Sequence, residues 1–154
     1  MLQTNYATGV EVAPTPCGAG EVTSYRAQIA LATGDETLNQ IIEMGPLPAG
    51  CVLVDAILDS DDLDTGSAAI TLDVGIMNGD AGAPLDADGN ARTCGIEIFS
   101  ASTVAQAGGV ARPTLATAFR IARSEVDRGI CVKLHAAPAT AQAGTIGLTL
   151  IYRG

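Results

Sequence analysis

The side chains best suited to chemistry in this sequence are one histidine, His135, and four cysteines, Cys17, Cys51, Cys94 and Cys131. A cysteine nucleophile needs an imidazole within hydrogen-bonding distance to take its proton. His135 and Cys131 fall on the same side of one apolar alternation, which is typical of a strand, and four residues along a strand span roughly 13 Å. The spacing therefore excludes a nucleophilic pair of Cys131 and His135, and nothing in the sequence supports a pair of His135 with another cysteine.

Other catalytic and cofactor-binding motifs are absent from the sequence. It contains no G-x-S-x-G, no phosphate-binding glycine loop and no C-x-x-C pair. One histidine cannot supply the several imidazoles that hold a metal ion in cupin-type barrels. We therefore expect a protein that is not an enzyme and that needs no cofactor.

Two acidic clusters carry oxygen atoms that calcium could bind. In the first, acidic or amide residues alternate, but Ala91 stands where a calcium loop has its glycine, and no helices flank the run. The second places four carboxylates within six residues, which repel one another unless a cation or a basic partner neutralises them. The alternative for both clusters is a solvated surface turn. We expect no metal ion, and the side chains that remain candidates for calcium are Asp59, Asp61, Asp62, Asp64, Asp86, Asp88 and Asn90.

The four cysteines are widely spaced. An even number permits disulfides, with three connectivities for four cysteines. However, the N-terminal residues show neither the basic nor the apolar region of a signal peptide, and a chain of 154 residues buries a core without cross-links. The sequence therefore favours free, buried thiols.

Charge is distributed unevenly along the chain. The net charge is −9; residues 1–111 contain fifteen acidic and two basic residues, whereas residues 112–154 contain two acidic and six basic residues. An acidic chain with 3% aromatic residues is a poor ligand for nucleic acid, and no apolar run reaches the ~18 residues of a transmembrane helix. We expect neither nucleic acid nor a membrane as a partner. An acidic patch on one subunit could instead meet a basic patch on another, unless both are solvated strand faces.

Most of the chain alternates apolar and polar residues with the period of two that marks a half-buried strand. The alternation predicts strands at residues 23–32, 37–44, 51–58, 70–76, 95–99, 113–122, 128–135 and 145–153. The strands at 51–58 and 70–76 flank an acidic turn and are expected to form a hairpin. Residues 45–50, with two prolines, predict a tight loop, and residues 100–107 a short helix. About eight strands and at most one short helix predict an all-β fold, an antiparallel, jelly-roll-like β-sandwich.

Two segments lack this alternation. Residues 1–22 contain the run APTPCGAGE, which favours extended or turn backbone, so we predict an extended N-terminal arm followed by a single sandwich domain at 23–154. The alternative is a frayed terminus, although Tyr6, Val10 and Val12 could dock the arm on a neighbour. The loop 78–92 is long and rich in turn residues, which is typical of a functional or mobile segment.

Three stretches carry a resemblance to a known family. They are LPAGCVLVDAILDSDDLDTGSAAITLDVGI (47–76), STVAQAGG (102–109) and APATAQAGTIGLTLIY (137–152). From about Thr23 onward the chain resembles the head-decoration, or cement, proteins of tailed bacteriophages and related capsid-associated β-sandwich proteins. The resemblance implies a subunit, often a trimer, that binds the major capsid protein on the exterior of the virion after assembly in the host cytoplasm.

Two alternatives stay open at this point. One is another virion component, such as a connector, tail or minor spike protein. The other is a carbohydrate- or calcium-dependent binding module, although sugar-binding faces usually offer exposed aromatic side chains and this chain has few. For an assembly module, the expected interface residues are Tyr6, Val10, Val12, Asp61, Asp62, Asp64, Arg112, Arg120 and Arg123.

Overall fold

A computed structural model describes residues 1–18 and 20–154 of the chain; Ala19, within the predicted arm, lies outside the described residues. Over these residues the chain forms nine strands and two short 3-10 turns. They are β1 (Leu2–Gln3), β2 (Val22–Leu31), β3 (Ile41–Leu47), β4 (Val52–Ser60), β5 (Thr71–Ile76), β6 (Phe99–Ser102), η1 (Val104–Gln106), β7 (Gly109–Ala111), η2 (Ala118–Arg120), β8 (Arg128–Ala136) and β9 (Gly144–Arg153). No helix in this part of the chain is long and apolar enough to cross a membrane.

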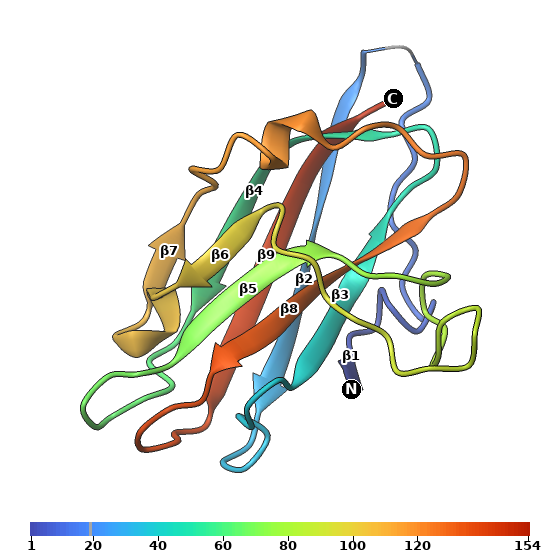
Figure 1. Cartoon of the computed structure of the whole chain (residues 1–154). Helices are drawn as coiled ribbons and strands as arrows, with labels where there is room; N and C mark the ends of the chain where they lie inside the picture. The colour runs from blue at the N-terminus through green and yellow to red at the C-terminus, as the bar shows by residue number, and fades with distance from the viewer. Residues whose placement is uncertain (19) are drawn as a thin grey trace.

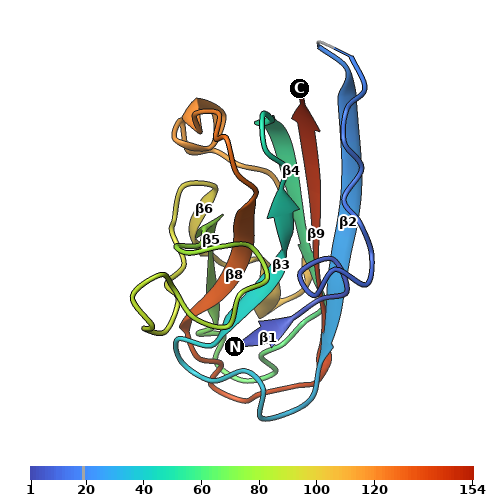
Figure 2. The same ribbon diagram turned by 90° about the vertical axis from the view of Figure 1, so that its right-hand side faces the viewer.

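The strands form two sheets packed face to face (Figures 1 and 2). Sheet A has the order β1-β3-β8-β5-β6, and sheet B has the order β2-β9-β4-β7. All pairs are antiparallel except β1 with β3. Apart from the short β1, the eight strands follow the order of a jelly roll: consecutive strands lie in different sheets, except β5 and β6, which are neighbours in sheet A. The predicted all-β sandwich is therefore confirmed.

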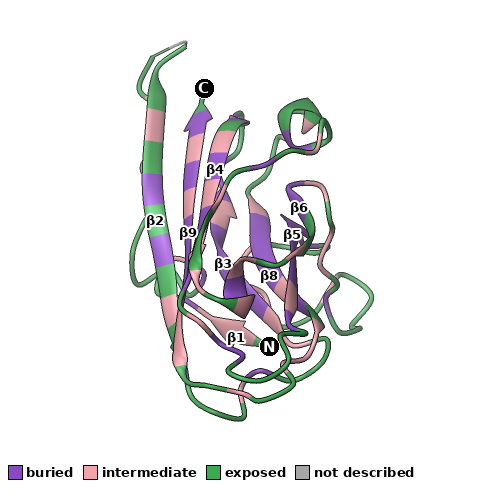
Figure 3. Cartoon of the chain, turned by 90° about the vertical axis from the view of Figure 1, so that its left-hand side faces the viewer, coloured by how far each residue is buried: buried purple, intermediate pink, exposed green. Residues whose placement is uncertain are grey.

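The core lies between the sheets and is filled by the inward residues of the long strands, whose alternation shifts by one at the bulges in β3 and β4. Figure 3 shows the resulting bands of buried and more exposed residues along the strands. The C-terminal strands β8 and β9 lie inside the sheets rather than at an edge, and together they contribute seven fully buried side chains to the core. On β8 the inward residues are Ile130, Val132 and Leu134, and β9 adds four more, all fully buried: Ile146, Leu148, Leu150 and Tyr152. The alternation in the sequence predicted these inward faces correctly.

The predicted hairpin between residues 51–58 and 70–76 is wrong. β4 pairs with β7 and β9 in sheet B, whereas β5 pairs with β6 and β8 in sheet A. The acidic turn between them carries the chain from one sheet to the other. Two apolar runs joined by a turn predict adjacent strands, but they do not determine whether the strands share a sheet.

Several predicted boundaries also differ from the structure. β3 begins at Ile41 and includes Pro46, and β1 covers only the start of β3, so the N–H that proline lacks is not needed by a neighbour. The predicted strand at 113–122 contains only η2, and Phe119 is 54% exposed. The predicted helix at 100–107 is instead part of β6, held by pairing with β5, followed by η1. At residues 99–102 sheet pairing overrides a weak helical preference, whereas residues 113–122 have no partner strand and form no strand of their own.

The N-terminal segment packs on its own subunit. β1 pairs with β3, and Ala13 belongs to the core. The ring of Tyr6 lies 4.4 Å from that of Tyr25, centroid to centroid, and the hydroxyl of Tyr152 donates a hydrogen bond to the carbonyl of Pro14. The segment is thus an integral part of the sandwich.

Candidate functional site

The structure places the single histidine away from any free thiol. Nδ1 of His135 lies 2.9 Å from Oδ2 of Asp73 on the neighbouring strand. The other Asp73 oxygen accepts a hydrogen bond from the backbone N–H of Ala101. Cys131, the nearest cysteine along the strand, is bonded to Cys94. This arrangement orients a half-exposed imidazole but provides no nucleophile.

The expectation of four free thiols is wrong for two of the cysteines. Cys94 and Cys131 form a disulfide, with their Cα atoms 6.0 Å apart, a normal separation for such a bond. Their spacing in sequence hides this proximity, because residues 78–93 leave β5, cross the outer face of sheet A and return beside it. Cys51 is free and buried, and burial raises the pKa of its thiol; Cys17 is free and exposed.

An ion pair fixes the far end of this loop (residues 78–93). Nη1 of Arg92 lies 2.8 Å from Oε2 of Glu43 on β3, and both side chains are fully buried. The N–H of Gly82 donates to the other oxygen of Glu43, and the amide of Gln3 donates to Oε2. The loop is therefore tied to β1 and β3, and the disulfide of the next residue, Cys94, ties its end to β8. The segment predicted to be functional or mobile covers part of sheet A.

A close approach of backbones completes this cover. The N–H of Gly95 donates to the carbonyl of Ile76, and Glu97 accepts from the N–H of Ile76. A Cβ atom on Gly75 would collide with the backbone of Gly95 and the carboxylate of Glu97. Glycine at this position lets the returning chain lie directly on β5.

Asp64, a predicted interface and calcium candidate, is instead a buried structural acceptor. It is 2% exposed. Its carboxylate accepts backbone hydrogen bonds from Ala69, Ile70, Ala139 and Thr140 at 2.7–3.1 Å. These bonds, the one from Ala69 most strongly, hold the pKa of the carboxyl far below its usual value. Asp64 joins two loops and has no free face for a partner.

The other acidic residues of this turn are more accessible. Asp61 is exposed and accepts from the N–H of Thr145, and Asp62 is half-buried and accepts from the N–H of Asp64. Asp59 lies apart from them, on the outer face of sheet B, where it pairs with Arg26. The predicted cluster therefore divides into one internal, one paired and two accessible carboxylates.

The second acidic run shapes a surface turn. Asp86 accepts from the backbone of Asp88 and Asn90 and from the side chain of Asn78. Across residues 1–18 and 20–154, no three Asp, Glu, His or Cys side chains converge as a metal ion requires.

The predicted basic set is also divided. Arg112 forms an ion pair with Asp55 on the outer face of sheet B. Arg120 and Arg123 are exposed at the end of the sandwich that carries η2 and the C-terminus, and the acidic turn lies at the opposite end (Figure 1). Asp61 and Asp62 therefore cannot pair with Arg120 or Arg123 of the same subunit.

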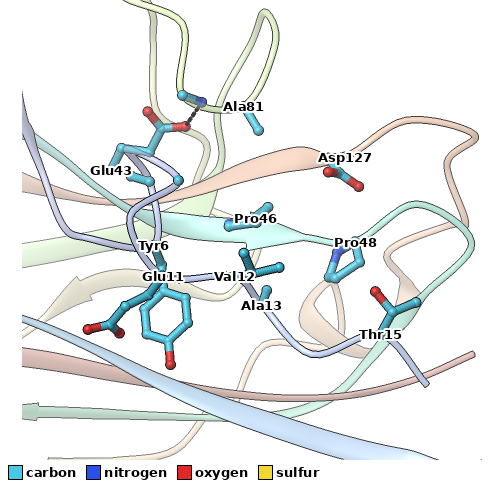
Figure 4. Close-up of a pocket in the computed structure, with 13 residues that line it drawn as sticks. Tyr6, Glu11, Val12, Ala13, Thr15, Glu43, Pro46, Pro48, Ala81 and Asp127 are labelled. Atoms are coloured by element: carbon cyan, nitrogen blue, oxygen red, sulfur yellow. Dashed lines mark hydrogen bonds between the residues drawn. The ribbon is translucent and has the colours of Figure 1, made fainter. Parts of the chain in front are cut away.

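A cavity of about 290 Å³ lies between the N-terminal segment and the end of β3 (Figure 4). Pro46, Pro48 and Val12 form much of its wall, and Glu11 and Asp127 lie on opposite sides. Asp127 accepts a hydrogen bond from the N–H of Ala49. No histidine or cysteine is among the described residues that line the cavity. Its wall therefore contains no Cys–His or Ser–His nucleophile–base pair.

Val10 and Val12 are 74% and 84% exposed. Of the three predicted interface residues in the arm, these two remain free to meet another molecule, while Tyr6 is held against Tyr25. The sequence interpretation missed Glu43 and Arg92. The sequence did offer one signal: residues 1–111 contain two basic residues, Arg26 and Arg92, among fifteen acidic ones. In the structure each of the two arginines pairs with an acidic residue.

The described strands form a jelly roll, a fold that occurs in viral capsid proteins as well as in other classes of protein. Solved structures of phage capsids contain chains similar to this one. A chain in the capsid of Ralstonia phage GP4 is 50% identical, with a TM-score of 0.90, over 98% of this chain and 96% of that chain. A chain of the cyanophage Pam1 capsid asymmetric unit is 26% identical, with a TM-score of 0.63, over 93% and 91% of the two chains.

No family model and no curated protein matches the sequence. The identity and coverage of the Ralstonia phage relative are sufficient to assign the family. The chain belongs to the bacteriophage capsid proteins, and it is a non-enzymatic structural protein of a virion.

Proposed function

We propose that this protein is a capsid decoration subunit, which binds the outside of a shell of major capsid protein and stabilises it. The observation that carries the proposal is the match of the whole chain, at 50% identity, to a chain found in a phage capsid. The fold supports the same role, because both sheets and the N-terminal segment close one core within one subunit. A subunit that is complete before assembly can be added to a finished shell.

The charge distribution supports contacts between unlike ends of neighbouring copies. Asp61 and Asp62 lie at one end of the sandwich, and Arg120 and Arg123 at the other. A contact between unlike surfaces of identical subunits is heterologous and can close into a ring. We propose that identical subunits associate into a homo-oligomer, a ring of three copies. Val10 and Val12 would form a further contact between copies.

The test is addition of purified protein to shells assembled from the major capsid protein alone. Co-sedimentation at a fixed number of copies per shell, with better retention of DNA on heating, is the expected result. Absence from the shell, together with binding to isolated connectors or tails, would assign the protein to another part of the virion.

A further inference from the structure

The edges of the two sheets differ greatly in length. Over the described residues, the edge strands β1, β6 and β7 contain two, four and three residues. The fourth edge strand, β2, contains ten residues and pairs with β9 along its whole length without a register shift. Short edges are one way in which proteins prevent further strand pairing, and β2 does not have this protection.

The free side of β2 carries unused backbone groups. No backbone hydrogen bond joins residues 22–31 to any described residue outside β9. In an antiparallel strand, alternate residues direct their N–H and C=O groups away from the partner strand. β2 has neither proline nor lysine nor a bulge, features that often block an edge. Its one charged residue, Arg26, pairs with Asp59 of sheet B.

Space for an additional chain lies beside this edge. A groove of about 490 Å³ runs along residues 26–30, and its opposite wall is formed by residues 3–6 and Glu11. Gln28 and Ala30 are exposed along it. A paired strand lies about 4.8 Å from its neighbour, so an extended polypeptide fits where a compact domain does not.

We propose that β2 takes up an extended segment of the shell's major capsid protein by strand addition. The proposal rests on the proposed decoration function. Main-chain pairing supplies affinity in such contacts and requires an extended polypeptide as the occupant. Arg26 as well as Glu11 lines the groove, so the groove does not offer a second copy the oppositely charged surface that the two ends of the sandwich offer. Two copies, each with a net charge of −9, repel each other at this edge, whereas a neutral segment does not.

Hydrogen–deuterium exchange of the wild-type protein tests the proposal, with and without shells. Exchange of the peptide covering residues 22–31 is expected to slow at least tenfold on binding, because outward amides become hydrogen-bonded. Residues 34–39, a loop at one end of the sandwich, serve as the internal control. Binding with unchanged exchange of β2 overturns strand addition alone, and no binding overturns the decoration function with it. Protection of β2 in concentrated protein without shells overturns the proposal in favour of a second copy.

A pair of proline variants adds a second test, since adjacent residues direct their N–H groups to opposite sides of β2. Of A27P and Q28P, one removes a donor to β9 and the other an outward donor. The variant that keeps the wild-type Tm is expected to lose binding to shells at least tenfold. Wild-type binding by that variant overturns the proposal, and if neither variant folds, the exchange experiment decides.

Discussion

Single residues in the acid-rich part of the chain act mainly within the subunit. Asp64 accepts four backbone hydrogen bonds, and Glu43 binds Arg92 in the interior. An acidic cluster in a sequence resembles a binding site for a cation or partner, but a carboxylate is also a strong acceptor for loop N–H groups. Part of the negative charge of the chain therefore stabilises loops and turns, because the carboxylates accept backbone hydrogen bonds.

We expect Asp64→Asn to lower the Tm at pH 7 because the amide is a weaker acceptor than the carboxylate. The folded state holds the carboxyl pKa below its unfolded value of about 3.9. The ionised group therefore stabilises the fold above that pH, and this contribution is lost as the pH falls below about 4. Calorimetry between pH 7 and pH 3 should show a shallower acid-induced fall in Tm for the variant.

Asp62→Asn is the matched control, because Asp62 accepts one backbone hydrogen bond in the same turn. Equal Tm values for Asp64→Asn and the wild type across this pH range would show that the four hydrogen bonds contribute nothing.

Two glycines test how closely elements approach each other. Alanine at Gly75 would meet the rigid backbone of Gly95, whereas alanine at Gly147 would meet the ends of the flexible side chains of Arg26 and Asp59. We expect Gly75→Ala to destabilise the fold by about 1–3 kcal/mol. Gly147→Ala should cost less than about 1 kcal/mol, the value of a surface ion pair. Urea unfolding measures both, and equal losses would contradict the close packing of residues 94–98 on β5.

At the scale of elements, strand parity could be predicted and strand partners could not. Ile146, Leu148 and Leu150 face the core as their alternation indicates, because parity follows from local geometry. One partner of β4 is β9, in which Arg153 pairs with Val52 and Ile146 with Ser60, and no local pattern reports a pairing over such a distance in sequence. The buried pair of Glu43 and Arg92 was missed for the same reason, since it forms only when the long loop folds across β3.

The disulfide should stabilise the element that covers sheet A. Cys94 and Cys131 are separated by 37 residues, and a cross-link over such a loop contributes about 2–4 kcal/mol by restricting the unfolded chain. We expect a reducing agent to lower the free energy of unfolding by this amount, measured with urea. Exchange of amides in residues 78–93 should increase more than exchange in β9.

The variant Cys94→Ser provides the control, because its stability should not respond to the reductant. Cys17→Ser belongs in every sample, since the exposed Cys17 thiol could form disulfides between molecules. A reductant effect that persists in Cys94→Ser would mean that the Cys94–Cys131 bond is not its source.

For the whole molecule, the polarity of charge between the two ends predicts salt-dependent association. We expect Asp61→Asn with Asp62→Asn to weaken association by roughly fivefold at low salt, as exposed ion pairs contribute little individually. The effect should nearly disappear at about 0.5 M NaCl, where charges are screened. Light scattering across a protein dilution series measures the association constant.

The control for this charge change is Asp80→Asn with Asp88→Asn, two exposed residues of the long loop. If both double variants weaken association equally, net charge explains the effect. If neither variant changes it, the acidic end does not meet a basic surface.

The position of β8 and β9 in the two sheets also affects how the protein is made. β2 and β4 both pair with β9, and β3 and β5 both pair with β8. On a ribosome that adds about 5–20 residues per second, β2 waits on the order of 10 s for its partner. The nascent chain therefore keeps β2, β3, β4 and β5 without their β8 and β9 partners until translation reaches the last strands, and neither sheet assembles from a chain released before residue 128.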